Sequence, residues 1–175
     1  VPDLMTMAKG LTSSYLPLGA VAMRQRIADA FADKAFGGGL TYNSHPVGCA
    51  AALAAIQVYE DDRLVERSRA TGLVMKRLMA EVAARHPSVG AVRSIGLFGI
   101  VELVRDRKTM EPMAPYNGTS EEMAALGRFF RQEGLYTMVR WNTFYTNPPL
   151  TITEAQLREA IAIIDRGLEI TDRAV

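Results

Sequence analysis

The feature that most constrains this chain is the alternation of short apolar runs with longer segments whose apolar residues recur at helical spacing. Residues 97–104 are almost continuously apolar, as in a strand that is buried on both faces. A second strand-like run, 89–95, precedes them, and Gly96 between the two predicts a turn. Strands that alternate with helices indicate an α/β or α+β sandwich. Further strand-like runs lie at 4–8, 18–23 and 135–140.

The longest helical segment begins near His45-Pro46, where Ser44 or His45 would cap the helix and Pro46 would occupy its first position. Asp61-Asp62 predicts a break, after which the helical spacing resumes. We place a domain boundary at this break, with residues 1–60 before it and 61–175 after it. A short helix is predicted over 24–32, and the last two helices begin with predicted capping boxes, Thr119 with Glu122 and Thr153 with Gln156.

Composition excludes several classes of protein. The chain has 20 Lys and Arg against 19 Asp and Glu, so its charge gives no reason to expect nucleic acid or an anionic membrane as a partner. No run approaches the roughly 20 apolar residues of a membrane helix. Cys49 is the one cysteine, which excludes an internal disulfide and fits a reducing, cytoplasmic location. The two histidines lack the paired spacing of a metal site; we expect His45 to cap a helix and His86 to be exposed.

Lys9 is the first candidate functional residue. It follows the strand-like run 4–8 and precedes Gly10, and three hydroxyl residues come next, Thr12, Ser13 and Ser14. The carboxyl ends of strands are where α/β sheets bind ligands. Burial at that edge would favour an uncharged amine, which could attack a carbonyl carbon and form a Schiff base. The alternative, which the residues alone favour, is a solvated surface lysine.

A glycine-rich loop, 37–41, that ends at Thr41 is the second candidate. It matches neither a P-loop nor a dinucleotide-binding turn. Its backbone N–H groups and the Thr41 hydroxyl, just before a helix start, could nevertheless bind a phosphate. A mobile surface loop is an equally good interpretation.

Arg140 is the third candidate. It ends a strand-like run and precedes Trp141. An arginine beside an aromatic ring could hold a carboxylate or a sulfonate. The alternative is a surface arginine on an edge strand.

Four motifs follow one another along the chain and cover nearly all of it. The first two are residues 8–20, AKGLTSSYLPLGA, and residues 40–46, LTYNSHP, which lead into an alanine-rich helix. The other two are Gly96-Leu97-Phe98-Gly99 before a strand and Pro148-Pro149-Leu150 before the last helix. In content and order these motifs resemble the signatures of the class III pyridoxal-phosphate-dependent aminotransferases. The first two together are highly specific, and the last two are weaker.

The resemblance implies an α/β fold, that of the fold type I pyridoxal-phosphate-dependent transferases. Residues 1–60 would be the C-terminal end of the large cofactor-binding domain, and 61–175 the small C-terminal α+β domain. Lys9 would form a Schiff base with the cofactor, pyridoxal 5′-phosphate, and its freed amine would later move a proton between substrate and cofactor. The resemblance also implies a homodimer with shared active sites, in which Thr41 would bind the phosphate of the neighbouring subunit's cofactor.

Within the family, residues 136–149 look most like the branch that uses taurine or other ω-amino acids with pyruvate. The acetylornithine branch has an arginine three residues before the double proline, and this chain has Tyr145 there, which argues against such a substrate. Arg140 would then bind the anionic end of the substrate. The leading hypothesis is amino-group transfer from an ω-amino acid or amine, with taurine among the candidates, to pyruvate or a similar 2-oxo acid.

The family also places cofactor-binding groups upstream of the lysine: a phosphate-binding turn, an aromatic ring and an aspartate on the pyridine nitrogen. Only eight residues precede Lys9, and the chain begins Val1-Pro2-Asp3. We therefore expect a fragment that is inactive by itself. Two alternatives stay open: an aminomutase or decarboxylase with the same cofactor and fold, and a truncated, non-catalytic module.

Overall fold

Two helices meet at the break predicted at Asp61-Asp62. Helix α2 (Pro46–Asp61) ends there, and α3 (Leu64–Arg85) begins three residues later. The computed structural model describes residues 1–175 and divides beside this break into two units, Val1–Leu64 and Val65–Val175, named here the first unit and the second unit. The assignment of residues 1–60 and 61–175 to the large and small domains of a complete enzyme stays a prediction.

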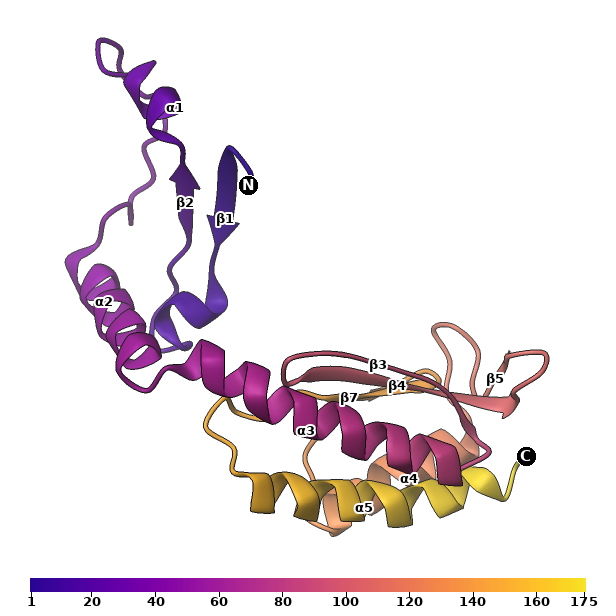
Figure 1. The fold of residues 1–175 in the computed structure, drawn as a ribbon. Helices are drawn as coiled ribbons and strands as arrows, with labels where there is room; N and C mark the ends of the chain where they lie inside the picture. The colour runs from indigo at the N-terminus through magenta and orange to yellow at the C-terminus, as the bar shows by residue number, and fades with distance from the viewer. The chain divides into compact units, whose positions relative to one another are not determined.

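The first unit contains a two-stranded antiparallel sheet. Strands β1 (Leu4–Met7) and β2 (Ala20–Met23) lie side by side (Figure 1), with Leu4 opposite Met23 at one end. The 3₁₀ helix η1 (Lys9–Thr12) follows β1, and the short helix α1 (Gln25–Asp29) follows β2. Both strands and the short helix predicted from the sequence are therefore present, and each is shorter than predicted.

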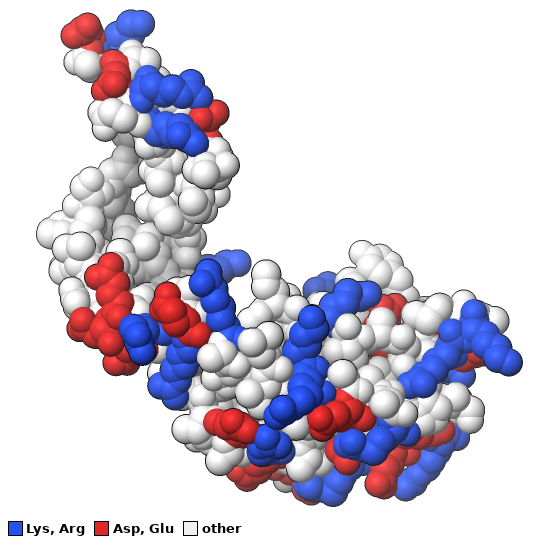
Figure 2. All heavy atoms as spheres, viewed as in Figure 1, with Lys and Arg blue, Asp and Glu red and all other residues white.

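The sheet of the first unit is largely exposed. Every residue of β1 and three of the four residues of β2 are exposed, including Leu4 at 54% and Val21 at 56%. Figure 2 shows an uncharged surface over the middle of this unit, with charged side chains gathered near α1. Because a two-stranded sheet buries little apolar surface by itself, the first unit has no apolar core of its own.

The second unit is an antiparallel sheet with three helices along one face (Figure 1). The order of its main strands is β3 (Val89–Ile95), β4 (Phe98–Asp106), β7 (Thr143–Thr146) and β6 (Val139–Arg140), and β5 (Glu111–Pro112) pairs with β4. The predicted β3–β4 hairpin is confirmed, with Gly96 at φ +54° in its turn. The helices are α3, α4 (Glu121–Gln132) and α5 (Glu154–Asp172). No helix is both long enough and apolar enough to cross a membrane.

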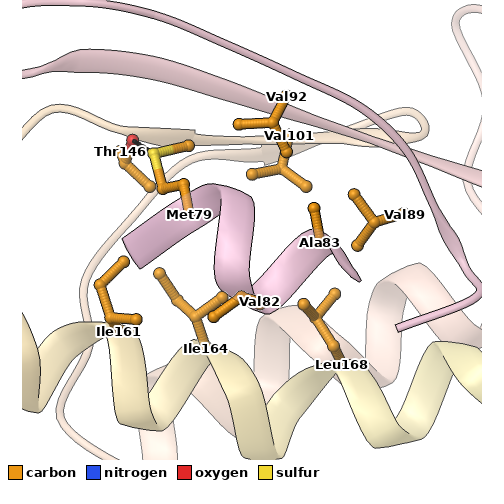
Figure 3. A pocket seen from close by; sticks show the side chains of 10 residues that line it. All are labelled: Met79, Val82, Ala83, Val89, Val92, Val101, Thr146, Ile161, Ile164 and Leu168. Atoms are coloured by element: carbon orange, nitrogen blue, oxygen red, sulfur yellow. Dashed lines mark hydrogen bonds between the residues drawn. The ribbon is translucent and has the colours of Figure 1, made fainter. Parts of the chain in front are cut away.

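One apolar core holds the second unit together. Side chains from α3, α5 and the sheet point toward one another in Figure 3, among them Met79, Val101 and Ile164. They enclose a cavity of about 10 Å³, room for no more than one water molecule. This region is therefore packed core rather than a ligand site. The helical faces predicted from the sequence are buried in it: Met123, Leu126 and Phe130 on α4, and Leu157, Ile161, Ile164 and Leu168 on α5.

Helix α4 begins one residue later than predicted. Ser120 rather than Thr119 is the N-cap, and its hydroxyl accepts a hydrogen bond from the Met123 N–H at 3.3 Å. Hydrogen bonds from the backbone N–H of Glu122 and from the Ser120 hydroxyl, helped by Arg105, hold the pKa of the Glu122 carboxyl below its ordinary value despite partial burial. At α5 the predicted capping box of Thr153 with Gln156 is confirmed.

The strand predicted at 135–140 is reduced to Val139–Arg140, and the predicted first residue, Leu135, lies instead in the turn that ends α4. Gly134 has φ +80°, and its N–H donates to the carbonyl oxygen of Arg131. The Leu135 N–H donates to the carbonyl oxygen of Phe130 at 2.8 Å. This pair of bonds is a Schellman motif, so Leu135 belongs to the helix end rather than to the sheet.

His86 was predicted to be exposed, and this is wrong: it is 7% exposed. Its Nδ1 lies 2.6 Å from Oδ2 of Asp172, and its Nε2 lies 2.9 Å from Oδ1 of Asp165. Burial would raise the pKa of Asp165, but hydrogen bonds from His86 and Arg85 outweigh it and hold that pKa below its ordinary value. The cluster joins the C-terminal half of α5 to the segment between α3 and β3.

Candidate functional site

Lys9 lies directly after the first strand. β1 stops at Met7, Ala8 is extended at φ −160°, and Lys9 begins η1 with φ +54°. The Leu11 N–H donates to the carbonyl oxygen of Ala8 at 3.2 Å and closes this turn. A non-glycine residue in the left-handed region costs roughly 1–2 kcal/mol. Such a conformation persists only where the surrounding structure enforces it.

The loop after this lysine supplies that constraint. Thr12 is 1% exposed, and its hydroxyl donates to the carbonyl oxygen of Leu16 at 2.6 Å. From α2, the Tyr59 hydroxyl donates to the carbonyl oxygen of Gly10 at 3.3 Å. The two serines after Thr12 also have positive φ and are exposed. Nothing near Tyr59 in the sequence indicates its bond to Gly10, which lies 49 residues away along the chain.

The Lys9 side chain is exposed, rather than buried at the sheet edge. No carboxylate pairs with it, and it lines a shallow hollow of the first unit that contains hydroxyl and apolar groups but no acidic side chain. The other lining residues are Ala8, Thr12, Ser14, Leu16, Pro17, Leu18 and Gly19. Schiff-base formation with a carbonyl compound needs an uncharged primary amine. Lys9 has no ion-pair partner, but it lacks the burial that was expected to favour the uncharged form.

Thr41 lies in an irregular loop of the first unit and is exposed. Asn43 closes this loop: its side-chain N–H donates to the carbonyl oxygen of Gly38 at 2.9 Å, and its backbone N–H donates to that of Leu40 at 3.0 Å. α2 begins only at Pro46, and a turn at residues 41–44 separates Thr41 from it. Thr41 therefore does not lie directly at the helix N-terminus. The glycine loop borders a second hollow, which shares residues 17–19 with the hollow at Lys9. Thr41 itself lines neither.

Arg140 belongs to the second unit, whereas Lys9 and Thr41 belong to the first. It ends β6, is exposed and has no carboxylate partner. Its guanidinium carbon lies 4.2 Å from the centre of the Trp141 ring. The Trp141 ring centre lies 4.4 Å from that of Tyr116, which comes from the loop before α4. The predicted arginine–aromatic pair is present, but no local pattern in the sequence pointed to Tyr116.

Tyr145, at the position that distinguishes the acetylornithine branch, lies in β7. Its N–H donates to the carbonyl oxygen of Met138 at 3.1 Å, and its ring packs 6.1 Å from that of Phe98. It lines a hollow of about 510 Å³ in the second unit, between residues 135–138 and α5. Arg140 does not line this hollow.

Comparison with known proteins identifies the class to which these features belong. The sequence profile of the class-III aminotransferases matches residues 1–168. The chain therefore belongs to the class-III aminotransferase family.

Relatives with assigned names are much longer than this chain. The putrescine–pyruvate aminotransferase of Pseudomonas aeruginosa is 34% identical over 175 residues, which cover 99% of this chain and 38% of the relative. The adenosylmethionine-8-amino-7-oxononanoate aminotransferase of Anoxybacillus flavithermus is 37% identical over 180 residues, which cover 98% of this chain and 38% of the relative. The chain thus spans about two fifths of the length of these two proteins.

Solved structures agree with this assignment. The taurine:2-oxoglutarate aminotransferase from Bifidobacterium kashiwanohense, solved in complex with PLP and glutamate, matches with a TM-score of 0.91 at 34% identity. The match covers 99% of this chain and 39% of that one. The α/β fold expected from the resemblance, that of the fold type I transferases, is confirmed.

Proposed function

We propose that this chain is part of a longer enzyme that transfers an amino group from an ω-amino acid or amine to pyruvate or a similar 2-oxo acid, with pyridoxal phosphate as cofactor. The observation that carries the proposal is the unpaired amine of Lys9, held directly after β1 by a constrained turn. Relatives named for putrescine, 5-aminovalerate and 4-aminobutyrate support a donor with a terminal amine. The neighbour named for taurine keeps that donor among the candidates.

The residues at Lys9 fit covalent attachment of this cofactor. The hollow presents one primary amine, the hydroxyl of Ser14 and apolar side chains, and no acidic group that would compete for the amine. No residue that lines it could hold a protonated pyridine nitrogen, which needs a carboxylate. We therefore propose that this carboxylate comes from a part of the enzyme outside residues 1–175.

Each predicted site residue has a role in this proposal. When bound, the cofactor supplies an electron sink for the carbanion at the amine-bearing carbon. Lys9 would hold the cofactor covalently, and its amine, when free, would accept the proton from that carbon. The Thr41 hydroxyl would bind phosphate at the neighbouring subunit's site in a homodimer, and Arg140 would bind the anionic end of the acid. We propose a cytoplasmic location on the basis of cysteine usage alone.

The first experiment tests whether Lys9 is a preformed attachment site in this chain. The lysines are Lys9, Lys34, Lys76 and Lys108, and all are exposed. After incubation with pyridoxal phosphate and reduction with borohydride, peptide mapping should find the adduct mainly on Lys9. Lys9→Arg should remove this adduct, and Lys34→Arg, in the same unit, should leave it unchanged. Equal labelling of all four lysines would show that Lys9 is not a preformed attachment site in this chain.

The second experiment uses the complete enzyme. Lys9→Ala should lower kcat for amino-group transfer by at least about 10³-fold and leave the circular dichroism spectrum unchanged, because the side chain is exposed. Substantial residual turnover would refute the role of Lys9. If the unmodified enzyme transfers no amino group to pyruvate or 2-oxoglutarate from any of a panel of ω-amines, the aminomutase or decarboxylase alternative would replace the transferase.

A further inference from the structure

The turn between β6 and β7 has a fixed backbone. Trp141 has φ +54°, in the left-handed region that tight hairpin turns require. The Leu103 N–H donates to the carbonyl oxygen of Asn142 at 2.7 Å, and the Asn142 side chain donates to the carbonyl oxygen of Leu103 at 3.2 Å. The Thr143 hydroxyl donates to the carbonyl oxygen of Arg140 at 2.8 Å. The turn is thus bonded both to β4 and within itself, so it presents Arg140 and Trp141 from a defined position.

Arg140 and Trp141 on this turn form a three-membered cluster with Tyr116 from the loop before α4, named here the stack, in which the two rings are tilted. The Arg140 guanidinium lies 4.2 Å from the centre of the Trp141 ring, and the Tyr116 ring lies 4.4 Å from it at an interplanar angle of 49°. A guanidinium over an indole face is a favourable cation–π arrangement. Trp141 is half-buried, whereas Arg140 and Tyr116 are exposed.

The stack leaves the hydrogen-bonding capacity of Arg140 unused. Other arginines of the second unit form ion pairs with carboxylates. Arg93 pairs with Glu102 at 3.0 Å, and Arg105 pairs with Glu122 at 3.0 Å. The Arg140 guanidinium instead lies over the Trp141 ring, and no carboxylate lies within ion-pair distance. Its N–H groups therefore stay available to an external anion, and the fork of a guanidinium matches the paired oxygens of a carboxylate or sulfonate.

We propose that Trp141, supported by Tyr116, is a positioning residue for Arg140: it orders the guanidinium so that the N–H groups can bind the anionic end of the substrate. This inference rests on the proposed role of Arg140 in substrate binding. A free arginine side chain loses up to about 2 kcal/mol of rotamer entropy when a ligand immobilises it. An arginine that is already ordered on a ring loses less, so the anion binds more tightly.

Kinetics of the complete enzyme test the inference. Arg140→Gln should raise KM for the 2-oxo acid by about 10- to 100-fold, because it removes the charged donor. Trp141→Leu should raise the same KM by about 3- to 10-fold with little change in kcat. Trp141→Phe keeps a ring under the guanidinium and should restore KM to within about 2-fold of the unmodified enzyme. Arg128→Gln, an exposed arginine on α4, is the matched control and should leave KM unchanged.

The two proposals fail differently in this experiment. If Arg140→Gln leaves KM unchanged, Arg140 does not bind the substrate. If Arg140→Gln raises KM while Trp141→Leu does not, or while Trp141→Phe is as defective as Trp141→Leu, the role of Arg140 stands and the positioning role of Trp141 is overturned.

A binding measurement on this chain covers the case in which Trp141→Leu does not fold. Trp141 is the one tryptophan of the sequence, so intrinsic emission reports directly on the stack. Titration with acetate or methanesulfonate at constant ionic strength should change the emission, and the change should be absent in Arg140→Gln and present in Arg128→Gln. The stronger response of the two identifies carboxylate or sulfonate as the preferred group. No response to either anion, or the same response to neutral acetamide, would overturn the inference.

Discussion

Lys9, Ser13 and Ser14 share one loop of the first unit, and all three have positive φ, at 54°, 49° and 65°. Non-glycine residues in this region of backbone space carry strain, which concentrates at functional sites. Here the hydrogen bond of the buried Thr12 hydroxyl and the bond from Tyr59 to Gly10 stabilise the strained backbone of the loop. For the proposed function, this means that the backbone position of Lys9 is constrained, although its side chain is exposed.

At the same scale, Asp165 should make the stability of the second unit depend on pH. Burial would raise its pKa, but hydrogen bonds from His86 and Arg85 keep it below the ordinary value. Because the folded-state pKa is lower than the unfolded value of about 3.9, the carboxylate stabilises the fold above that pH. This stabilisation is lost as the pH falls through the folded-state pKa.

Asp165→Asn should therefore lower the free energy of unfolding at neutral pH, and this loss should shrink as the pH falls below the unfolded value of about 3.9. Urea denaturation of this chain at a series of pH values measures the difference. Glu169→Gln, an exposed carboxylate on the same helix, is the control and should show no such trend. A loss of equal size at both ends of the pH range would show that Asp165 contributes through packing alone.

Among the elements, helices α3 and α4 each contain a buried glycine, and the space around the two glycines differs. A Cβ on Gly72 of α3 would lie 2.5 Å from the backbone carbonyl carbon and oxygen of Gly96 in the β3–β4 turn. A Cβ on Gly127 of α4 would lie 3.7 Å from Val139, an ordinary contact distance. Gly72 is thus required by the approach of a helix to a hairpin, whereas Gly127 is not required by space.

Alanine at these two positions should have opposite effects on stability. Gly72→Ala forces the helix away from the turn and should lower the free energy of unfolding by about 1–3 kcal/mol. Gly127→Ala fits the available space and should be neutral or raise it by up to about 1 kcal/mol, because alanine favours the helix. Thermal unfolding of both variants is the measurement, and a tolerated Gly72→Ala would mean that the hairpin moves without cost.

At the scale of the whole molecule, the two units differ in how they could be stable. The second unit has an extended apolar core, with Met75, Leu103 and Phe144 fully buried. The first unit exposes both of its strands. The chain covers about two fifths of the length of its relatives, and we propose that the rest of the enzyme covers these strands.

Residues 65–175 expressed alone should therefore fold, and residues 1–64 alone should not. The first should unfold cooperatively in urea, followed by the emission of Trp141, because its core is complete. In the 175-residue chain, the amides of β1 and β2 should exchange with solvent much faster than those of β4. Equal protection of β1 and β4 would show that the first unit is stable by itself.

Features that depend on a few neighbouring residues could be predicted from the sequence. These are the turn at Gly96, the start of α2 at Pro46, the break after Asp61, the capping box at Thr153 and the position of Lys9 after a strand. Proline, glycine and capping side chains act on the adjacent backbone, so their effect can be predicted from a short stretch of sequence.

Contacts between residues distant in the sequence could not be predicted and follow from the packing of the folded chain. It buried His86 between Asp165 and Asp172, and it brought Tyr116 beside Trp141. These contacts join segments far apart in the chain, and their geometry follows from how helices and strands pack around the core. A single sequence carries no local signal for such contacts. Arg140 could therefore be predicted as a candidate from its neighbour Trp141, whereas the contact of Trp141 with Tyr116 could not be predicted.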